Sequence, residues 1–276
     1  MSYRRYRQSN LALELGMIGL TILYFLPIYT LLAVALKPRG GAWGNFWEFP
    51  RGVTLANFAE VWREAPFLSS LLVSLGVTGS SILLLVALGA PAAYFLARNT
   101  DRLSHMLYYL FLLGIMFPFQ LALVPLYRIM LEAGLLGNPV SVVAFHVAYQ
   151  MPFTVFLYAG FIRSLSASYE EAALLDGATR WQAFWRVVVP LLRPITGTAV
   201  VLNVIFIWND FLTPFLYLSG SEYQTLPVMI FAFVGEYTAK YNLIFAGLLM
   251  AMLPVLVLYF LLQRYVIHGF ASGLRG

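Results

Sequence analysis

The stretch FLSSLLVSLGVTGSSILLLVALGAPAAYFLA, residues 67–97, contains no Asp, Glu, Lys or Arg. About 20 apolar residues in a helix cross the roughly 30 Å hydrocarbon core of a bilayer, so this stretch is long enough to span a membrane. It is far longer than the roughly 10-residue strands of outer-membrane barrels, and it does not sustain their alternation of apolar and polar residues. The stretch therefore predicts a membrane-spanning helix.

The rest of the chain has the same character. Of its 276 residues, 61% are hydrophobic and 11% are charged, and the mean hydropathy is +0.80. These charges are too few to cover the surface of a soluble domain. We predict an all-α, polytopic membrane protein with six transmembrane helices in a single domain of residues 1–276, since no long linker or tandem repeat divides the chain. The predicted spans are residues 11–36, 67–97, 106–131, 139–162, 195–218 and 243–262.

Basic residues predict the orientation of these spans. Eleven Lys and Arg residues fall on the side of the N-terminus and six on the other side. The positive-inside rule then places both termini in the cytoplasm, with the chain in the cell inner membrane. The first apolar run exceeds the 7–15 residues of a secretory signal peptide and predicts an uncleaved anchor. The net charge of +5 therefore reflects topology, and we expect no nucleic-acid partner.

Residues that would support catalysis or metal binding are scarce. The chain has no cysteine, and its three histidines, His105, His146 and His268, are far apart in the sequence. We therefore expect no metal site and no cofactor bound by this chain. The only lysines, Lys37 and Lys240, precede Pro and Tyr, so the Gly-Lys-Ser/Thr of an ATP-binding Walker A loop is absent. We expect no enzymatic activity in this chain.

A polar segment, residues 163–194, interrupts the apolar pattern after the fourth span. Two stretches in it, Ser168–Glu171 and Thr179–Gln182, have the spacing of capping boxes and predict the beginnings of two short helices. Gly177 lies between them and can adopt the left-handed conformation that ends the first helix. Pro190 limits the continuation of the second. The sequence predicts a compact helical pair suited to docking another protein.

This segment resembles the EAA loop of ABC-importer permeases. Glu171-Ala172-Ala173, three residues, Gly177, nine residues and Val187-Val188-Val189-Pro190 follow the pattern of that loop, with valines where the family has Ile-x-Leu. The chain is similar along its whole length to the maltose-type carbohydrate permeases, which have the type I ABC-importer permease fold. The other similar stretches are Ala92-Ala93-Tyr94 with Ala97-Arg98, Trp208-Asn209-Asp210-Phe211 with Pro214, and Gln263-Arg264-Tyr265 with Gly269 and Gly273.

The resemblance implies a permease subunit of a binding-protein-dependent importer, which translocates a di- or oligosaccharide by alternating access. The implied partners are a second permease subunit, two ATPase subunits that use ATP and Mg, and an extracytoplasmic sugar-binding protein, in a lipid membrane. The first helix of the loop would fit a groove of an ATPase subunit. The alternative is that Glu171 only caps its helix while Ala172 and Ala173 pack on the protein itself. The implied ATPase-coupling residues are Glu170, Glu171, Ala172, Ala173, Asp176, Gly177 and Pro190.

Polar residues inside the predicted spans are candidates for the substrate path. Asp210 is the only acid well inside a span, and Pro214 breaks the helix at the carbonyl of Asp210. Its carboxylate either lines the sugar path or accepts hydrogen bonds that hold the helix break. The same choice between sugar recognition and interhelical hydrogen bonding applies to the other candidates, while His146 is expected to be a neutral, hydrogen-bonded packing residue. The candidate path residues are Gln120, Tyr149, Gln150, Asn203, Asn209 and Asp210.

Two other functions remain open from the sequence. One is an ion-coupled secondary carrier with Asp210 as its proton or cation site, because broken helices also occur in carriers. The other is an ABC permease for a ligand of the glycerol-phosphate type. Dependence on ATPase partners would separate the carrier from the importer.

Overall fold

The computed structural model describes residues 2–38, 46–234 and 240–273. It is 80% helical, and none of these described residues forms a β-strand, so the all-α prediction is confirmed. The helices are α1 Ser2–Ala35, α2 Ala56–Glu64, α3 Phe67–Arg98, α4 Arg102–Met116, α5 Phe119–Glu132, α6 Pro139–Ser164, α7 Ser168–Leu175, α8 Arg180–Ala183, the π-helical turn η1 Phe184–Val188, α9 Val189–Leu191, α10 Arg193–Asn209, α11 Leu212–Tyr217, α12 Leu226–Phe231 and α13 Tyr241–Gly273.

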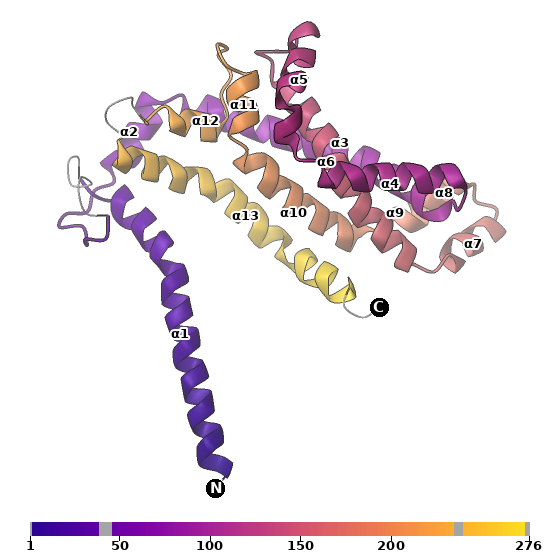
Figure 1. Cartoon of the computed structure of the whole chain (residues 1–276), viewed down its shortest axis with the longest axis horizontal. Helices are drawn as coiled ribbons and strands as arrows, with labels where there is room; N and C mark the ends of the chain where they lie inside the picture. Colours follow the sequence, from indigo (N-terminus) through magenta and orange to yellow (C-terminus); the bar gives the residue numbers. More distant parts are fainter. Residues whose placement is uncertain (1, 39–45, 235–239, 274–276) are drawn as a thin grey trace. The chain divides into compact units, whose positions relative to one another are not determined.

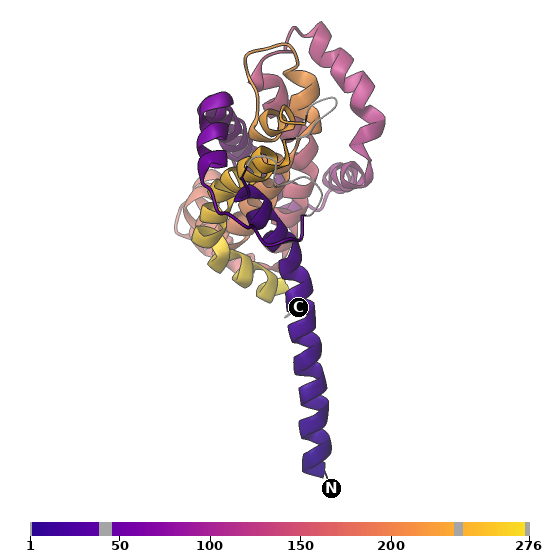
Figure 2. The same ribbon diagram turned by 90° about the vertical axis from the view of Figure 1, so that its left-hand side faces the viewer.

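Within the part of the chain that the structure describes, four helices are continuous and apolar over a length that can cross a membrane. Their apolar parts coincide closely with four of the predicted spans, and α1 is a single unbroken rod in both views (Figures 1 and 2). Many large apolar side chains of these helices are exposed, as expected of surfaces in contact with lipid or another membrane subunit. The four segments are Leu13–Ala35, Phe67–Arg98, Pro139–Ser164 and Tyr241–Leu261.

The predicted third span, residues 106–131, is not one helix. It consists of α4 and α5, whose axes meet at 101° (Figure 1). Phe117 is extended, with φ −79° and ψ 117°, because the ring of Pro118 disfavours a helical conformation in the residue before it. The third predicted span is therefore present as a bent pair of helices, with its break at this proline.

The predicted fifth span, residues 195–218, is also divided. α10 ends at Asn209, Asp210 is extended with φ −68° and ψ 120°, and α11 begins at Leu212. At its other end, α10 bends by 70° from the segment Arg180–Leu191. The described residues thus contain four continuous candidate spans, and up to six if each bent pair counts as one span.

The backbone clusters into two compact units. The first contains Met1–Phe67 and Met229–Met252, and the second contains Leu68–Val228 and Leu253–Gly276. That residues 1–276 act as one domain stays a prediction.

In the first unit, Asn57 connects three parts of the chain. Its Nδ2 donates to the carbonyls of Ala35, 2.7 Å away, and Lys37, 2.8 Å away, and its Oδ1 accepts from Nδ2 of Asn242 at 2.7 Å. The last carbonyls of a helix have no partner within the helix. The buried Asn57 side chain therefore satisfies the end of α1 and holds α2 and α13 to it.

We expect Asn57→Leu to destabilise the protein by about 1–3 kcal/mol, because both carbonyls would stay buried without a donor. The loss should appear as a lower unfolding temperature of the detergent-purified protein. Asn57→Asp is the matched variant, because it keeps the size but turns the donor into a charged acceptor facing two carbonyls. A wild-type unfolding temperature in Asn57→Asp would contradict this role.

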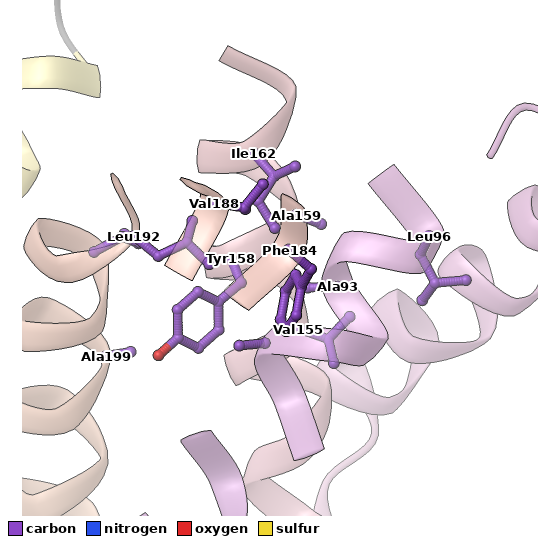
Figure 3. Close-up of a cluster of buried hydrophobic side chains, with 12 residues drawn as sticks. Ala93, Leu96, Val155, Tyr158, Ala159, Ile162, Phe184, Val188, Leu192 and Ala199 are labelled. Carbon is purple, nitrogen blue, oxygen red and sulfur yellow. The ribbon is translucent and has the colours of Figure 1, made fainter. Parts of the chain in front are cut away.

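In the second unit, α6 lies at the centre and packs against α4, α10 and α11. The buried cluster in Figure 3 joins α6 to α3, η1 and α10. Tyr158 of α6 is fully buried in this cluster, and its hydroxyl donates to Oγ1 of Thr196 at 3.0 Å. The polar segment between α6 and α10 is therefore fixed to the spans by an apolar core.

Candidate functional site

The helix α7 ends in a glycine turn, as the sequence predicts. Gly177 has φ +86°. Its N–H donates to the carbonyl of Leu174 at 3.0 Å, and the N–H of Ala178 donates to the carbonyl of Ala173 at 3.0 Å. These two bonds form a Schellman motif, which satisfies the last carbonyls of α7 and sets the direction of the chain leaving it.

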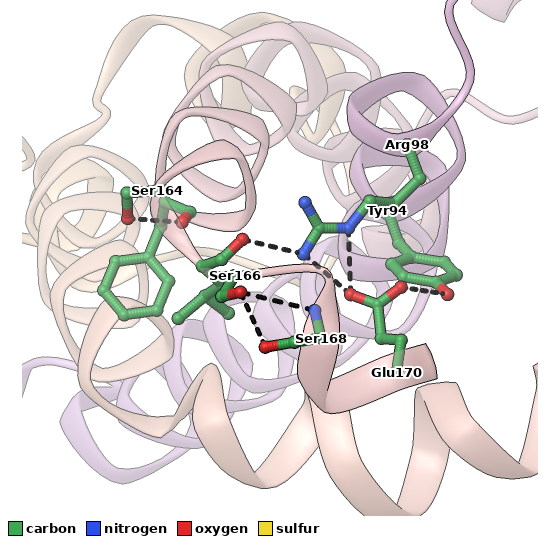
Figure 4. Close-up of polar contacts among 8 residues, drawn as sticks. Tyr94, Arg98, Ser164, Ser166, Ser168 and Glu170 are labelled. Atoms are coloured by element: carbon green, nitrogen blue, oxygen red, sulfur yellow. Dashed lines mark hydrogen bonds and ion pairs between the residues drawn. The ribbon is translucent and has the colours of Figure 1, made fainter. Parts of the chain in front are cut away.

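Of the two expected capping boxes, the second is present and the first is not. Gln182 N–H donates to Oγ1 of Thr179 at 3.2 Å, and Thr179 N–H donates to Oε1 of Gln182 at 2.9 Å. Ser168, in contrast, is already the first residue of α7, and the N-cap position is taken by Ala167, whose side chain cannot accept a hydrogen bond. The hydroxyl of Ser166 accepts the N–H of Ser168 at 3.3 Å and lies 2.7 Å from the Ser168 hydroxyl (Figure 4). The Ser168 hydroxyl is thus hydrogen-bonded to Ser166 and does not act as the predicted cap.

Most of the α7 surface is free of contacts with the rest of the chain. Glu171, Ala172, Asp176 and Gly177 are exposed, while Ala173 is half-buried and Pro190 of α9 is exposed. Large apolar side chains of this polar segment are exposed as well, most of all Leu175 at 89% and Trp181 at 64%. An exposed apolar patch rimmed by polar residues is typical of a protein interaction surface.

Glu170 differs from its neighbours because its side chain points into the protein. Tyr94 donates its hydroxyl to Oε2 of Glu170 at 2.8 Å, and Arg98 donates Nε to Oε1 at 2.9 Å (Figure 4). The Glu170 side chain is 12% exposed and that of Arg98 is 20% exposed. Glu170 was predicted with the docking residues, yet it lies on the opposite, inward side of α7.

The connection from α3 to α4 lies just beyond Arg98. Asp101 caps α4 by accepting the Ser104 N–H at 3.1 Å and the Ser104 hydroxyl at 2.6 Å. Both hydrogen bonds lower the pKa of the Asp101 carboxyl, and the bond from the Ser104 hydroxyl contributes most. The two bonds at this cap therefore favour the ionised form of the carboxyl.

The π-helical turn η1 leads from the exposed segment into the core. Val189 N–H donates to the carbonyl of Phe184, five residues earlier, directly before Pro190, which has no N–H to donate. Phe184 and Val188 are 2% and 1% exposed. The chain then bends at Leu192, which is also buried. The segment from α7 to Leu192 is therefore exposed at its α7 end and packed among the spans at its Leu192 end.

Among the candidate path residues, the structure brings Gln150 and Asn203 together. Gln150 Nε2 donates to Oδ1 of Asn203 at 3.0 Å, and Asn203 Nδ2 donates to Oγ1 of Thr154 at 3.1 Å. Asn203 Nδ2 also donates to the carbonyl of Ala199 at 2.9 Å. All three side chains are buried, so this group links α6 to α10. Thr154 was not singled out by the sequence, because threonine is common in apolar helices.

Asp210 holds the break between α10 and α11. Its Oδ1 accepts the N–H of Leu212 at 3.1 Å and of Thr213 at 3.4 Å. Its Oδ2 lies 3.5 Å from Nε2 of His146. His146 lines a space of about 10 Å³ together with Ser74, Thr225 and other residues. His146 is buried as expected, but neither ring nitrogen has a hydrogen bond, so the expected hydrogen-bonding was wrong.

The remaining candidates lie in different surroundings. Tyr149 is part of an aromatic group, with ring centroids 5.4 Å from Phe119, 5.7 Å from Phe145 and 5.5 Å from Phe206. Gln120 is exposed. Asn209 is exposed and donates Nδ2 to the carbonyl of Ile205 at 2.7 Å. The six candidates therefore do not form one polar cluster.

The sequence pattern of the family described as "Binding-protein-dependent transport system inner membrane component" matches residues 86–271, which include α7, the glycine turn and Asp210. The chain belongs to this family. This membership decides against the ion-coupled carrier. The protein is a multi-pass membrane permease of a binding-protein-dependent transport system, and its relatives are transport permeases rather than enzymes.

Among the relatives of this permease is the melibiose/raffinose/stachyose import permease MelC of Bacillus subtilis, 39% identical over 251 residues and covering 91% of each chain. The probable starch degradation products permease AmyC of Thermoanaerobacterium thermosulfurigenes is 32% identical and covers 96% of each chain. A crystal structure of a bacterial ABC transporter for alginate import shares the fold, with a TM-score of 0.80, 22% identity and coverage of 96% of this chain and 98% of the other.

Proposed function

We propose that this permease is one of two membrane subunits of an ABC importer for di- or oligosaccharides. A second permease would complete the path, two ATPase subunits would use ATP and Mg, and an extracytoplasmic binding protein would deliver the sugar. Both termini and α7 would face the cytoplasm. The names of the relatives MelC and AmyC support an oligosaccharide over a glycerol-phosphate-type ligand.

The observation that carries the proposal is the exposed face of α7. Glu171, Ala172 and Leu175 are exposed on a short helix whose end is fixed by the Gly177 turn. A helix with an apolar face fits a hydrophobic groove in a partner. The proposed docking surface consists of Glu171, Ala172, Ala173, Leu175, Asp176 and Gly177.

The mechanism we infer is alternating access. When the ATPase subunits close around ATP, they would draw α7 with them, and the adjoining α8, η1 and α9 would transmit this movement as a rigid segment to α10 through the bend at Leu192. Pro190 lies in α9, so we assign it a role in setting the direction of the chain between η1 and α10. The path would open outward in this state and inward after hydrolysis.

For the substrate path, we assign different roles to the six candidates. Gln120, Tyr149 and Asn209 are accessible or aromatic and suit contact with sugar hydroxyls and ring faces. Three others instead hold the helices in place through hydrogen bonds: Gln150, Asn203 and Asp210.

Purification of the full chain from its native membranes in mild detergent tests the proposal. We expect an ATPase and a second permease to co-purify. Leu175→Glu should lower ATPase recovery at least tenfold, because it replaces the exposed apolar contact by a charge, and a loss of about 1.4 kcal/mol of binding free energy is tenfold in affinity. Leu175→Met keeps the apolar contact and should retain the ATPase.

Uptake by the purified complex in proteoliposomes, with its binding protein present, then tests the ligand class. Raffinose should be taken up and glycerol 3-phosphate should not. Recovery of the chain alone, without ATPase activity, would overturn the importer, and uptake of only the phosphate ester would overturn the sugar assignment.

A further inference from the structure

We propose that Tyr94, Arg98 and Glu170 form a clamp that carries the movement of α7 directly into the span α3. This inference rests on the proposed function, since it concerns how a displaced α7 acts on the spans. It adds a second connection to the one through η1 and α10. Glu170 and Arg98 are positioning residues in this scheme and make no contact with substrate.

The clamp uses both oxygens of the Glu170 carboxylate. Oε2 accepts the Tyr94 hydroxyl at 2.8 Å, and Oε1 accepts Arg98 Nε at 2.9 Å and lies 2.7 Å from Arg98 Nη2. Charge-assisted bonds of this kind are stronger and more directional than those between neutral groups. Since Tyr94 and Arg98 are one helical turn apart on α3, a shift of the carboxylate pulls on a rigid stretch of that helix.

Arg98 also holds a third element. Its Nη2 donates to the carbonyl of Leu165 at 3.1 Å, and Leu165 is the C-cap residue directly after α6. One planar guanidinium thus joins the end of α3, the end of α6 and the first turn of α7. A lysine ammonium lacks this fixed fork of donors and cannot reproduce the arrangement.

The clamp lies where water competes weakly for its groups. The side chains of Glu170 and Arg98 are 12% and 20% exposed, whereas Glu171, the next acid on α7, is exposed. The partial exclusion of water strengthens the ion pair relative to a surface pair. The two adjacent glutamates therefore have opposite tasks, with Glu170 binding the permease itself and Glu171 facing outward.

Apolar packing supports the clamp from behind. The Tyr94 ring lies 4.9 Å from the ring of Phe184 in η1, and Phe184 belongs to the buried cluster of α3, α6 and α10 (Figure 3). α7 itself packs against α8 and η1. Movement of α7 relative to α3 would break the clamp and this packing together, so the elements are expected to move as one body.

The test uses the complete importer, reconstituted in proteoliposomes, with sugar uptake measured per ATP hydrolysed. We expect Arg98→Lys and Glu170→Gln to lower this ratio at least tenfold while the ATPase still co-purifies, and Tyr94→Phe to lower it less, since it removes one neutral donor. Arg102→Gln, which changes an exposed arginine at the start of α4, is the control and should leave the ratio unchanged.

A rescue experiment separates transmission of movement from simple loss of folding. The chain has no cysteine, so Arg98→Cys with Glu170→Cys creates the only thiol pair. A short bis-maleimide that bridges the two thiols should restore the ratio at least fivefold, while each single cysteine variant treated with the same reagent should remain uncoupled.

Each outcome has one meaning. If the wild-type complex couples uptake to hydrolysis and the clamp variants couple within twofold of it, the clamp is overturned. Continued uncoupling after bridging also overturns it, because a covalent tie would then not replace the ion pair. If the wild-type chain recruits no ATPase, the proposed function itself fails.

Discussion

Replacing Gly177 by valine is expected to lower sugar uptake at least tenfold while the protein still inserts and folds. Gly177 has φ +86°, a conformation that costs a β-branched residue about 1–3 kcal/mol. No atom of a residue beyond its two chain neighbours lies within 4 Å of the position that a Cβ would take, so the cost comes from the backbone and not from a clash. The chain would relieve it by opening the Schellman turn, and α7 would leave its fixed direction.

Uptake per ATP hydrolysed in proteoliposomes measures this effect. Gly134→Val is the matched control, because Gly134 has φ +67°, also has open space around its Cβ position, and lies after α5, away from α7. Gly177→Asn should have a smaller effect than valine, since asparagine tolerates the left-handed region. Equal losses of uptake in the Gly134 and Gly177 valine variants would contradict a special role for the α7 turn.

Removing the Asp210 side chain is expected to have the second large effect. Asp210→Ala leaves the first N–H groups of α11 without their acceptor, which costs about 1–2 kcal/mol at a helix N-terminus. It also leaves His146 facing an enlarged space. We expect a lower unfolding temperature and at least a tenfold loss of uptake, because the break between α10 and α11 would lose its fixed geometry.

Asp210→Asn distinguishes the two interpretations of this residue. Asparagine keeps the Oδ1 acceptor for Leu212 and Thr213 and places an N–H donor toward Nε2 of His146, which can accept in one neutral tautomer. Near-normal stability and uptake are therefore expected. A normal unfolding temperature with lost uptake would instead place the carboxylate in the sugar path.

Features set by local chemistry were predictable from the sequence. The spans follow from uninterrupted apolar runs, the turn at Gly177 from the conformational freedom of glycine, and the break at Asp210 from Pro214 four residues later. The false capping box at Ser168 shows the limit of such local rules. Ser166, two residues earlier, bonds to Ser168, and a spacing pattern does not rank two competing hydroxyls.

Features that depend on distant pairing were not predictable. Arg98 and Glu170 are 72 positions apart, and Gln150 and Asn203 are 53 apart. A single sequence shows each of these residues as an isolated polar group, with nothing to say which partner it meets. The 101° angle between α4 and α5 belongs here as well, since Pro118 predicts a disturbance but the neighbouring helices set its size.

The wide turn Phe184–Val188 sets the rotational phase between α8 and the helix that follows. An α-helical residue turns the chain by about 100°, so one residue more or less in this turn rotates all that follows by that angle. With the five-residue turn, Trp181 points outward while Phe184, Val188 and Leu192 point inward. Deleting a single residue here would turn the inward face of the following helix by about 100° away from the core, while the residues on either side of the turn stayed the same.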